Sequence, residues 1–418
     1  MTHETPRTAI RASVPLFIPT LLILASAVSI LATDLYTPSM PHLQDVFDTD
    51  AGWVQLTITL NLAAYALAQL IYGPLSDRIG RRPVLLGGMV GFAAASVGCA
   101  LAGSIETFIL ARVLQGLTAC AEAVVAYAVI RELYDQAGAV RVYAAYGMAV
   151  ALAPAVGPVI GGYMHVWLGW RSNFILLTGL IILVTLLIWR YLPETLQKPD
   201  RGALLPRRLL RGYATLLGDS PFMTYTLIMA LVLGGLFAML AAFPFLFIER
   251  MAVPTEQYGY YYGAIVLAFF LGSLAANQAA GRIGSDPLLA IGLALCALGG
   301  GSFSLLVAAG QETPLAVTVT QCFFGLGLGL VFATAPVRAF DVCRAGHGYA
   351  AAMLGALPMA GGGLATFCIA LLHDDSAWPI ALLLTVTTLS AAALYLTVQP
   401  WRAGSGSSFT PGGGSLRR

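Results

Sequence analysis

Long apolar segments alternate with short polar stretches along nearly the whole sequence. Twelve of these segments are long enough to cross a hydrocarbon core of about 30 Å, which requires about 20 helical residues. Backbone polar groups cannot stay unsatisfied in lipid, and a barrel strand needs only about 10 residues, so each segment is predicted to be an α-helix. The predicted spans are 15–40, 52–75, 83–103, 106–130, 140–164, 171–192, 221–248, 257–280, 286–309, 313–336, 348–372 and 378–399.

The composition indicates the same class of protein. Hydrophobic residues make up 58% of the 418 residues and charged residues only 10%, whereas a soluble domain carries about 25% charged residues. The first apolar segment is too long for a signal-peptide core and lacks a small-residue cleavage site, so we expect it to be retained. The sequence therefore predicts an all-α membrane protein.

Basic residues are distributed unequally between the two sides of the predicted helices. If the N-terminus lies inside, all of the 22 Lys and Arg residues except Arg112, Arg171 and Arg250 fall in cytoplasmic segments. This is the bias expected from the positive-inside rule. Both termini are therefore predicted to be cytoplasmic.

A central polar segment divides the predicted helices six and six. Residues 193–219 carry several prolines and arginines, and a short pattern, Arg78-Ile79-Gly80-x-x-Pro83, recurs half a chain later as Arg282-Ile283-Gly284-x-x-Pro287. Two similar halves around a central site form the architecture that permits alternating access. We expect two pseudo-symmetric six-helix bundles and a flexible Gly- and Ser-rich tail, with the boundaries 1–192, a cytoplasmic linker 193–219, 220–400 and a tail 401–418.

Neither metal nor enzyme chemistry is suggested by the polar residues. The six cysteines and five histidines are scattered singly, without the close spacing of zinc or redox sites. No Walker-A sequence and no nucleophile–base arrangement is visible in the loops. The prediction is a protein without cofactor or enzymatic activity, driven by an ion gradient.

The run from Gly73 to Pro83 is predicted to be a compact charged loop between two apolar spans. Glycine allows two helices to approach closely, a carboxylate can accept from an arginine or a helix N-terminus, and arginines can anchor at an anionic leaflet. The alternative is a loop that only sets topology. The second copy has Gly281 and Ser285 in place of an acid and an arginine, which predicts a one-sided conformational latch formed by Gly73, Asp77, Arg78, Arg81 and Arg82.

Four motifs carry a resemblance to a known family. The Gly73–Pro83 run resembles the loop signature of the major facilitator superfamily, and Arg112–Gly116 is similar to its fourth-helix motif. Gly147 followed by Ala153–Gly162 resembles the fifth-helix motif of its antiporters. With Ala32–Pro41 in the first span, the chain resembles the twelve-span drug:proton antiporters of the Bcr/CflA and MdfA type.

The resemblance implies proton-coupled efflux of small amphipathic compounds, such as drugs or antibiotics, by alternating access in a bacterial inner membrane. The expected partners are a small-molecule substrate, protons and the lipid bilayer, with no nucleic acid, and the expected state is a monomer. Two alternatives remain. One is a narrow-specificity exporter of an endogenous natural product, siderophore or amino acid, and the other is a sensor that binds without translocating.

Three ionisable residues, Asp34, Arg112 and Glu122, fall inside predicted spans. Burial of such a residue costs at least about 2.5–3.5 kcal/mol and usually marks function. Asp34 is the predicted proton carrier, unless it lies at the outer helix end and faces water. Arg112 is expected to organise buried polar groups and respond to a nearby acid, unless its long side chain reaches the interface.

Glu122 is predicted to be a second proton carrier or an attractor of cationic substrates, with a buried protonated structural role as the alternative. The MdfA-like antiporters have a further acid two turns before the first-span Asp, where this chain has Ser26. Their two-acid mechanism therefore transfers only if Glu122 supplies the missing carboxylate from another helix.

The remaining candidates are uncharged. Asn61, Tyr65 and Gln69 share one helix face at a spacing of four residues, which suits loose recognition of varied ligands, although core packing explains each residue equally well. The predicted substrate-cavity residues are Tyr36, Asn61, Tyr65, Gln69, Gln115, Tyr127 and Met239. The fifth-helix motif is expected to give a smooth, proline-bent surface at the seam between the halves, formed by Gly147, Pro154, Gly157, Pro158, Gly161 and Gly162.

Overall fold

The computed structural model describes residues 17–343, 347–372, 374 and 376–405, and these residues form helices and connections without a β-strand. In chain order the elements are α2 Phe17–Asp34, η1 Thr37–Ser39, α3 Met40–Phe47, α4 Ala51–Ile79, α5 Arg81–Leu101, α6 Ile105–Leu133, α7 Gln136–Leu168, α8 Arg171–Tyr191, α9 Pro206–Leu217, α10 Ser220–Pro244, η2 Phe245–Arg250, α11 Thr255–Ile283, α12 Ser285–Ala308, α13 Pro314–Val342, α14 His347–Leu371 and α15 Trp378–Ser405.

The twelve predicted membrane spans are confirmed. Among the described residues, 12 helical segments are long and apolar enough to cross a membrane. The first combines α2, η1 and α3, and the seventh combines α10 with the π-helical turn η2. At the C-terminal end α15 continues to Ser405, beyond the predicted start of the tail at 401, and the remainder of that predicted tail, 406–418, lies outside the described residues.

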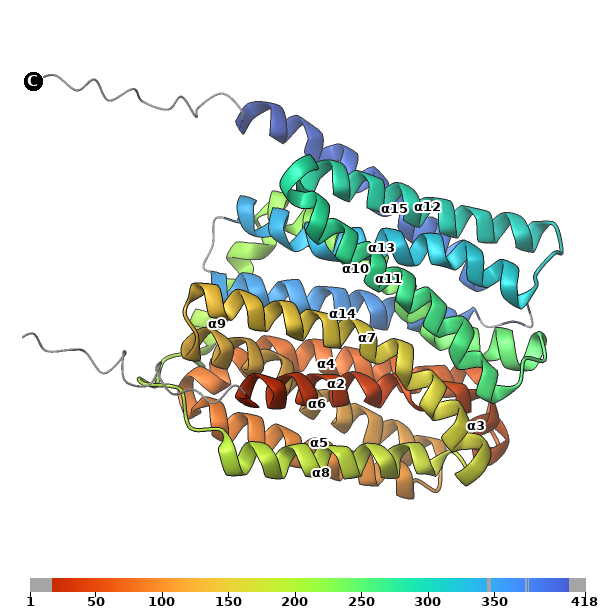
Figure 1. Ribbon diagram of the computed structural model, residues 1–418, viewed down its shortest axis with the longest axis horizontal. Helices are drawn as coiled ribbons and strands as arrows, with labels where there is room; N and C mark the ends of the chain where they lie inside the picture. Colours follow the sequence, from red (N-terminus) through yellow and green to blue (C-terminus); the bar gives the residue numbers. More distant parts are fainter. Residues whose placement is uncertain (1–16, 344–346, 373, 375, 406–418) are drawn as a thin grey trace, which may run out of the picture.

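The helices form two bundles with the same internal packing. In the N-terminal bundle α4 packs on α6, α2 on α7 and α5 on α8, while in the C-terminal bundle α11 packs on α13, α10 on α14 and α12 on α15. Each pair in the second bundle is the counterpart of a pair in the first. The most extensive contacts between the bundles are α4 with α14 and α7 with α11, and Figure 1 shows α9 and α3 at opposite ends of the molecule.

The α7–α11 contact is closest near the end of the molecule where α3 lies, here called the α3 end. A Cβ atom on Gly162 of α7 would stand 2.7 Å from the carbonyl oxygen of Thr255, and one on Gly263 of α11 would stand 3.1 Å from that of Ala155. Only glycine permits such an approach of two backbones. At the opposite end, here called the α9 end, a Cβ on Gly147 or Gly281 would have no neighbour within 4 Å.

Polar contacts between the bundles cluster at the α3 end as well. The amide of Gln44 in α3 donates to the carboxylate of Glu249 in η2 at 2.5 Å, and the hydroxyl groups of Tyr163 in α7 and Tyr260 in α11 lie 3.0 Å apart. Together with the glycine contacts, these bonds hold the two bundles together at the α3 end.

The stretch predicted as a loop between the second and third spans is largely helical. Helix α4 continues through Gly73 and Asp77 to Ile79, and only Gly80, with φ of 121°, turns the chain into α5. The prediction was wrong because a helix that leaves the apolar layer needs no further apolar residues to continue. Side chains rarely adopt this value of φ, so glycine is required at the turn.

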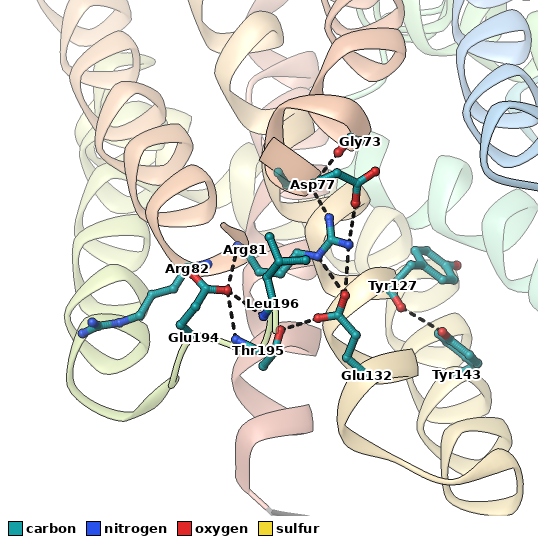
Figure 2. A network of polar contacts seen from close by, with 11 residues as sticks. Gly73, Asp77, Arg81, Arg82, Tyr127, Glu132, Tyr143, Glu194, Thr195 and Leu196 are labelled. Carbon is teal, nitrogen blue, oxygen red and sulfur yellow. Dashed lines mark hydrogen bonds and ion pairs between the residues drawn. The ribbon is translucent and has the colours of Figure 1, made fainter. Parts of the chain in front are cut away.

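Arg81 stands at the centre of the charge network that follows this turn (Figure 2). Its guanidinium group forms ion pairs with Asp77 at 2.6 Å and with Glu132 of α6 at 2.9 Å, and it donates to the hydroxyl of Ser76. The side chain is buried, so the expectation that Arg81 anchors at the leaflet is wrong. Arg78 is exposed.

The segment after α8 completes the network. The Glu194 carboxylate accepts hydrogen bonds from the backbone N–H groups of Arg81 and Arg82 at 2.9 and 3.1 Å, and so caps the N-terminus of α5 (Figure 2). The Thr195 hydroxyl donates to Glu132 at 2.5 Å, and Arg82 itself donates to the carbonyl oxygen of Trp189. All of these bonds lie within the N-terminal bundle and its following segment.

The second half carries an ion pair of opposite polarity at the corresponding place. Gly281 and Ser285 cannot reproduce the Asp77–Arg81 pair, but Asp286 at the start of α12 pairs with Arg338 of α13 at 2.7 Å. In the first half the base, Arg81, is on the earlier helix, α5, and the acid, Glu132, is on the later one, α6. A charged connection therefore joins these two helices in both bundles.

We expect substitution at the glycine seam to separate the bundles at the α3 end. Gly162→Val places a branched side chain where even a Cβ meets the Thr255 backbone at 2.7 Å. Spin labels at the exposed positions 167 of α7 and 311 between α12 and α13, measured by pulsed electron resonance, will then report a longer distance. Gly147→Val is the matched control, because open space surrounds that position, and equal lengthening in both variants would contradict the role of the seam.

Removal of the buried arginine is expected to destabilise the N-terminal bundle. Arg81→Ala leaves Glu132 without its charged donor, and hydrogen bonds to charged groups contribute about 1.5–3 kcal/mol. Thermal unfolding of the detergent-solubilised protein will show a lower melting temperature for Arg81→Ala and little change for the exposed Arg78→Ala. A comparable loss in the two variants would assign the effect to net charge.

Candidate functional site

Glu122 lies in a buried polar cluster formed by three helices of the N-terminal bundle. Its side chain on α6 is only 4% exposed, and its carboxylate accepts a hydrogen bond from Ser26 on α2. The Ser26 hydroxyl also hydrogen-bonds with the Tyr146 hydroxyl on α7 at 2.7 Å. Ser26 therefore connects Tyr146 to Glu122, and we call these three residues the Glu122 cluster.

The Glu122 cluster contains no compensating cation. Among the described residues, no basic side chain forms an ion pair with Glu122. Tyr65 of α4 and Tyr127 of α6 are near enough to interact with it electrostatically. Tyr127 is 50% exposed and its ring lies 5.0 Å from that of Tyr146, so an aromatic path leads from the buried carboxylate to the accessible surface.

Arg112 organises a second set of buried groups, the Arg112 network. The guanidinium group is fully buried, its Nη1 donates to the carbonyl oxygen of Ala32 at 3.0 Å and to the amide oxygen of Gln115, and it lies over the Tyr36 ring at 4.5 Å. Gln115 in turn donates to Ser96 of α5 at 2.8 Å. Because Arg112 is fully buried, the alternative in which it reaches the interface is excluded.

The Arg112 network retains unused hydrogen-bonding capacity. The Nε and Nη2 groups of Arg112 have no hydrogen-bond partner in the described structure. A guanidinium group does not lose its charge in proteins, and a buried donor without a partner costs about 1–3 kcal/mol or more when it is charged. Arg112 interacts electrostatically with Asp34.

Asp34 stands at the C-terminal end of α2, where the two bundles meet. It is 4% exposed, so the alternative in which it faces water is excluded. On one side, a Cβ on Gly157 of α7 would lie 2.7 Å from the Asp34 Cβ. On the other side, Asp34 interacts electrostatically with Tyr258 and Tyr262 of α11. An acid of the N-terminal bundle therefore interacts with residues of the C-terminal bundle.

The two acids lie at different depths of the same bundle. Ser26, the partner of Glu122, and Asp34 belong to one helix, and a rise of 1.5 Å per residue separates them by about 12 Å along its axis. Glu122 is thus nearer the α9 end, and Asp34 is nearer the α3 end. The structure does not join them into one hydrogen-bonded cluster.

The predicted cavity residues fall into two groups. Tyr36, Asn61, Gln115 and Met239 are buried, and Asn61 donates from its amide to the backbone oxygen of Arg112 at 2.8 Å. Met239 belongs to a hydrophobic core that contains residues of both bundles. Tyr65, Gln69 and Tyr127 reach accessible surface, and Gln69 also contacts Gly355 of α14.

Three tyrosines of the site were not among the predicted residues. Tyr146 precedes the glycine of the fifth-helix motif, and its hydroxyl has no signature in a sequence. Tyr258 and Tyr262 are spaced four residues apart on α11 and therefore share a face, which is a signal that was available. Among the described residues, no group of three or more His, Cys, Asp or Glu is placed to hold a metal ion.

Comparison with known proteins agrees with this architecture. The sequence profile of the Major Facilitator Superfamily matches residues 22–366. The chain is 30% identical over 369 residues to a chloramphenicol resistance protein of Pseudomonas aeruginosa, covering 86% of this chain and 85% of that protein. It is 31% identical over 323 residues to the multidrug transporter MdfA of Edwardsiella ictaluri, covering 75% and 77% of the two chains.

A further relative and a solved structure are also similar to this chain. A bicyclomycin resistance protein homolog of Haemophilus influenzae is 27% identical over 87% of this chain and 91% of its own length. Among solved structures, a D-xylose–proton symporter superposes with a TM-score of 0.73 at 15% identity, over 90% of this chain and 96% of the symporter. The profile, the relatives and the twelve-span fold together show that this multi-pass membrane transport protein belongs to the major facilitator superfamily.

Proposed function

We propose that this protein exports small amphipathic compounds, drugs and antibiotics among them, in exchange for protons. The observation that carries the proposal is the buried, cation-free carboxylate of Glu122 bonded to Ser26. The names of the relatives, which refer to chloramphenicol resistance, bicyclomycin resistance and multidrug transport, support the class of substrate. The Glu122 carboxylate favours ligands that carry a positive charge.

Glu122 supplies the acid that this chain lacks at position 26. MdfA-like antiporters are expected to have an acid on the first helix where this chain has Ser26, and here the Ser26 hydroxyl bonds to a carboxylate that comes from α6. In this proposal the carboxylate occupies the same place in the bundle, but it is attached to α6 instead of α2. The two-acid arrangement, Asp34 and Glu122, is thereby preserved.

Asp34 connects proton binding to the movement of the bundles. A charge on Asp34 acts on Tyr258 and Tyr262 of the opposite bundle and on Arg112 of its own. Protonation removes that charge, which changes the electrostatic interaction across the contact between α2, α7 and α11. A ligand or proton shifts a two-state equilibrium only by such a difference between the states.

The proposed orientation places the α9 end in the cytoplasm. The basic residues of the central segment and of the Arg81 turn then lie inside, and both termini are cytoplasmic in the inner membrane of a bacterium. In the proposal, the contacts that hold the bundles together at the α3 end close the outer side, and the protein acts as a monomer. The Arg81 network acts here as a brace within one bundle, because its bonds do not cross to the other.

Substrate-dependent proton movement in proteoliposomes tests the proposal. We expect the native protein to move protons when cationic or neutral drugs are added, Asp34→Asn to abolish this movement, and Glu122→Gln to lose cationic drugs first. Asp45→Asn, an exposed acid of α3, is the matched control and is expected to behave as the native protein. Binding of several drugs without proton movement would contradict the coupling, and transport of a single compound would favour a narrow-specificity exporter.

An exchange of the two side chains tests whether the acid has moved between helices. Glu122→Ser is expected to lose transport of cationic drugs, and the double variant Ser26→Glu with Glu122→Ser to recover it, since the carboxylate returns to the same cluster from α2. Uptake of a fluorescent cation into inverted vesicles measures the recovery. Failure of the double variant, when it folds and binds neutral drugs normally, would show that the carboxylate must be attached to α6.

A further inference from the structure

The segment between the bundles, predicted as a linker, contains the helix α9, which has one buried face and one exposed face. Leu216 is fully buried and Tyr213 half-buried against the bundles. Leu210 and Leu217 are 71% and 59% exposed, and their spacing of seven residues places them on one stripe. Sequence reasoning missed the helix because an amphipathic surface helix has no long apolar run.

A basic stripe lies next to the exposed leucines. Arg207 and Arg211 are one helical turn apart and both are exposed, and no acidic side chain among the described residues forms an ion pair with either. Arg208, three residues before Arg211, instead pairs with Asp200 at 2.5 Å, and this hydrogen bond lowers the pKa of the Asp200 carboxyl. The stripe therefore offers two uncompensated positive charges and leaves Arg208 neutralised.

The position of α9 is beside the membrane-spanning helices. The Tyr213 hydroxyl donates to the carbonyl oxygen of Leu70 in α4 at 2.7 Å. Leu70 precedes the end of α4 at Ile79 by about 13 Å, at 1.5 Å per residue. Helix α9 thus lies level with the last turns of α4, at one end of the molecule (Figure 1), where we expect the lipid headgroups.

Helix α9 contacts both bundles from this position. Tyr213 bonds to α4 of the N-terminal bundle, while its ring lies 5.1 Å from that of Tyr349 in α14 of the C-terminal bundle. Gly212 faces the same ring, and a Cβ there would be 2.8 Å from it. A displacement of α9 therefore changes the α4–α14 contact between the bundles.

We propose that α9 is an interfacial helix that binds the anionic lipid headgroups of the leaflet at the α9 end. Leu210 and Leu217 enter the boundary of the acyl chains, and Arg207 and Arg211 bind lipid phosphates. Amphipathic helices with leucines beside basic residues bind membranes in this way, and juxtamembrane basic residues are attracted by anionic lipids. Bound lipid then holds α9 against both bundles, whatever compound is transported.

Spin-label accessibility tests the insertion of the leucines. In full-length protein reconstituted into vesicles, with the native cysteines replaced, a label at position 210 or 217 is expected to be relaxed more by oxygen, which dissolves in lipid, than by a water-soluble nickel chelate. A label at Thr215, an exposed position on another face, is expected to show the reverse. Preference for the chelate at 210 and 217 would overturn the proposal.

Retention of anionic lipid tests the basic stripe. We expect full-length protein taken from membranes of mixed phosphatidylglycerol and phosphatidylcholine to retain phosphatidylglycerol preferentially, and each of Arg207→Gln and Arg211→Gln to weaken this binding about fivefold. Arg208→Gln is the matched control and is expected to have little effect. Equal loss in all three variants, or a preference insensitive to salt in the native protein, would overturn the proposal, because exposed charge attractions are screened by salt.

Discussion

The cost of placing charge inside a membrane-spanning bundle is the constraint on which this structure depends. Arg112 and Glu122 stand on the same helix, and each is buried, yet their surroundings differ. Arg112 is held by a backbone carbonyl, an amide and an aromatic ring, which leaves two of its donors unused. Glu122 accepts a hydrogen bond from the Ser26 hydroxyl, which also bonds to Tyr146, and has no cation as a partner among the described residues. A permanent charge and a carboxylate that can accept a proton are thereby kept within one bundle.

The connection between the bundles follows from how backbones approach each other. Where α7 meets α11, glycines replace side chains, so the two helices can pack closely without interlocking. Within each bundle an ion pair joins two neighbouring helices instead, Arg81 with Glu132 and Asp286 with Arg338. Such pairs are directional and resist sliding, whereas a glycine contact separates with few bonds to break. The rigid connections lie inside the bundles, and the separable ones lie between them, as rocking of one bundle against the other requires.

Asp34 lies where these two kinds of contact meet. It ends α2, faces Gly157 of α7 and acts on the tyrosines of α11. In the proposed mechanism, a change of its charge acts on the contact that opens. Helix α9 touches the other large contact, α4 with α14. If α9 binds lipid as proposed, these two contacts between the bundles face different environments, one an internal acid and the other the membrane.

The sequence by itself determined the twelve helices, the division into halves and the three intramembrane charges. Long apolar runs form helices in lipid, because a helix satisfies their backbone hydrogen bonds, and a charged residue within such a run is easily recognised. Tertiary structure decided which groups those charges meet: that Ser26 bonds to Glu122 from another helix, that Arg81 turns inward to Glu132, and that Tyr146, Tyr258 and Tyr262 join the site. Spacing along one helix fixes which residues share a face, but the rotation and depth at which helices pack depend on side chains of all of them at once. Tertiary structure also decided the helix α9, because its stability comes from packing against both bundles and not from an apolar run.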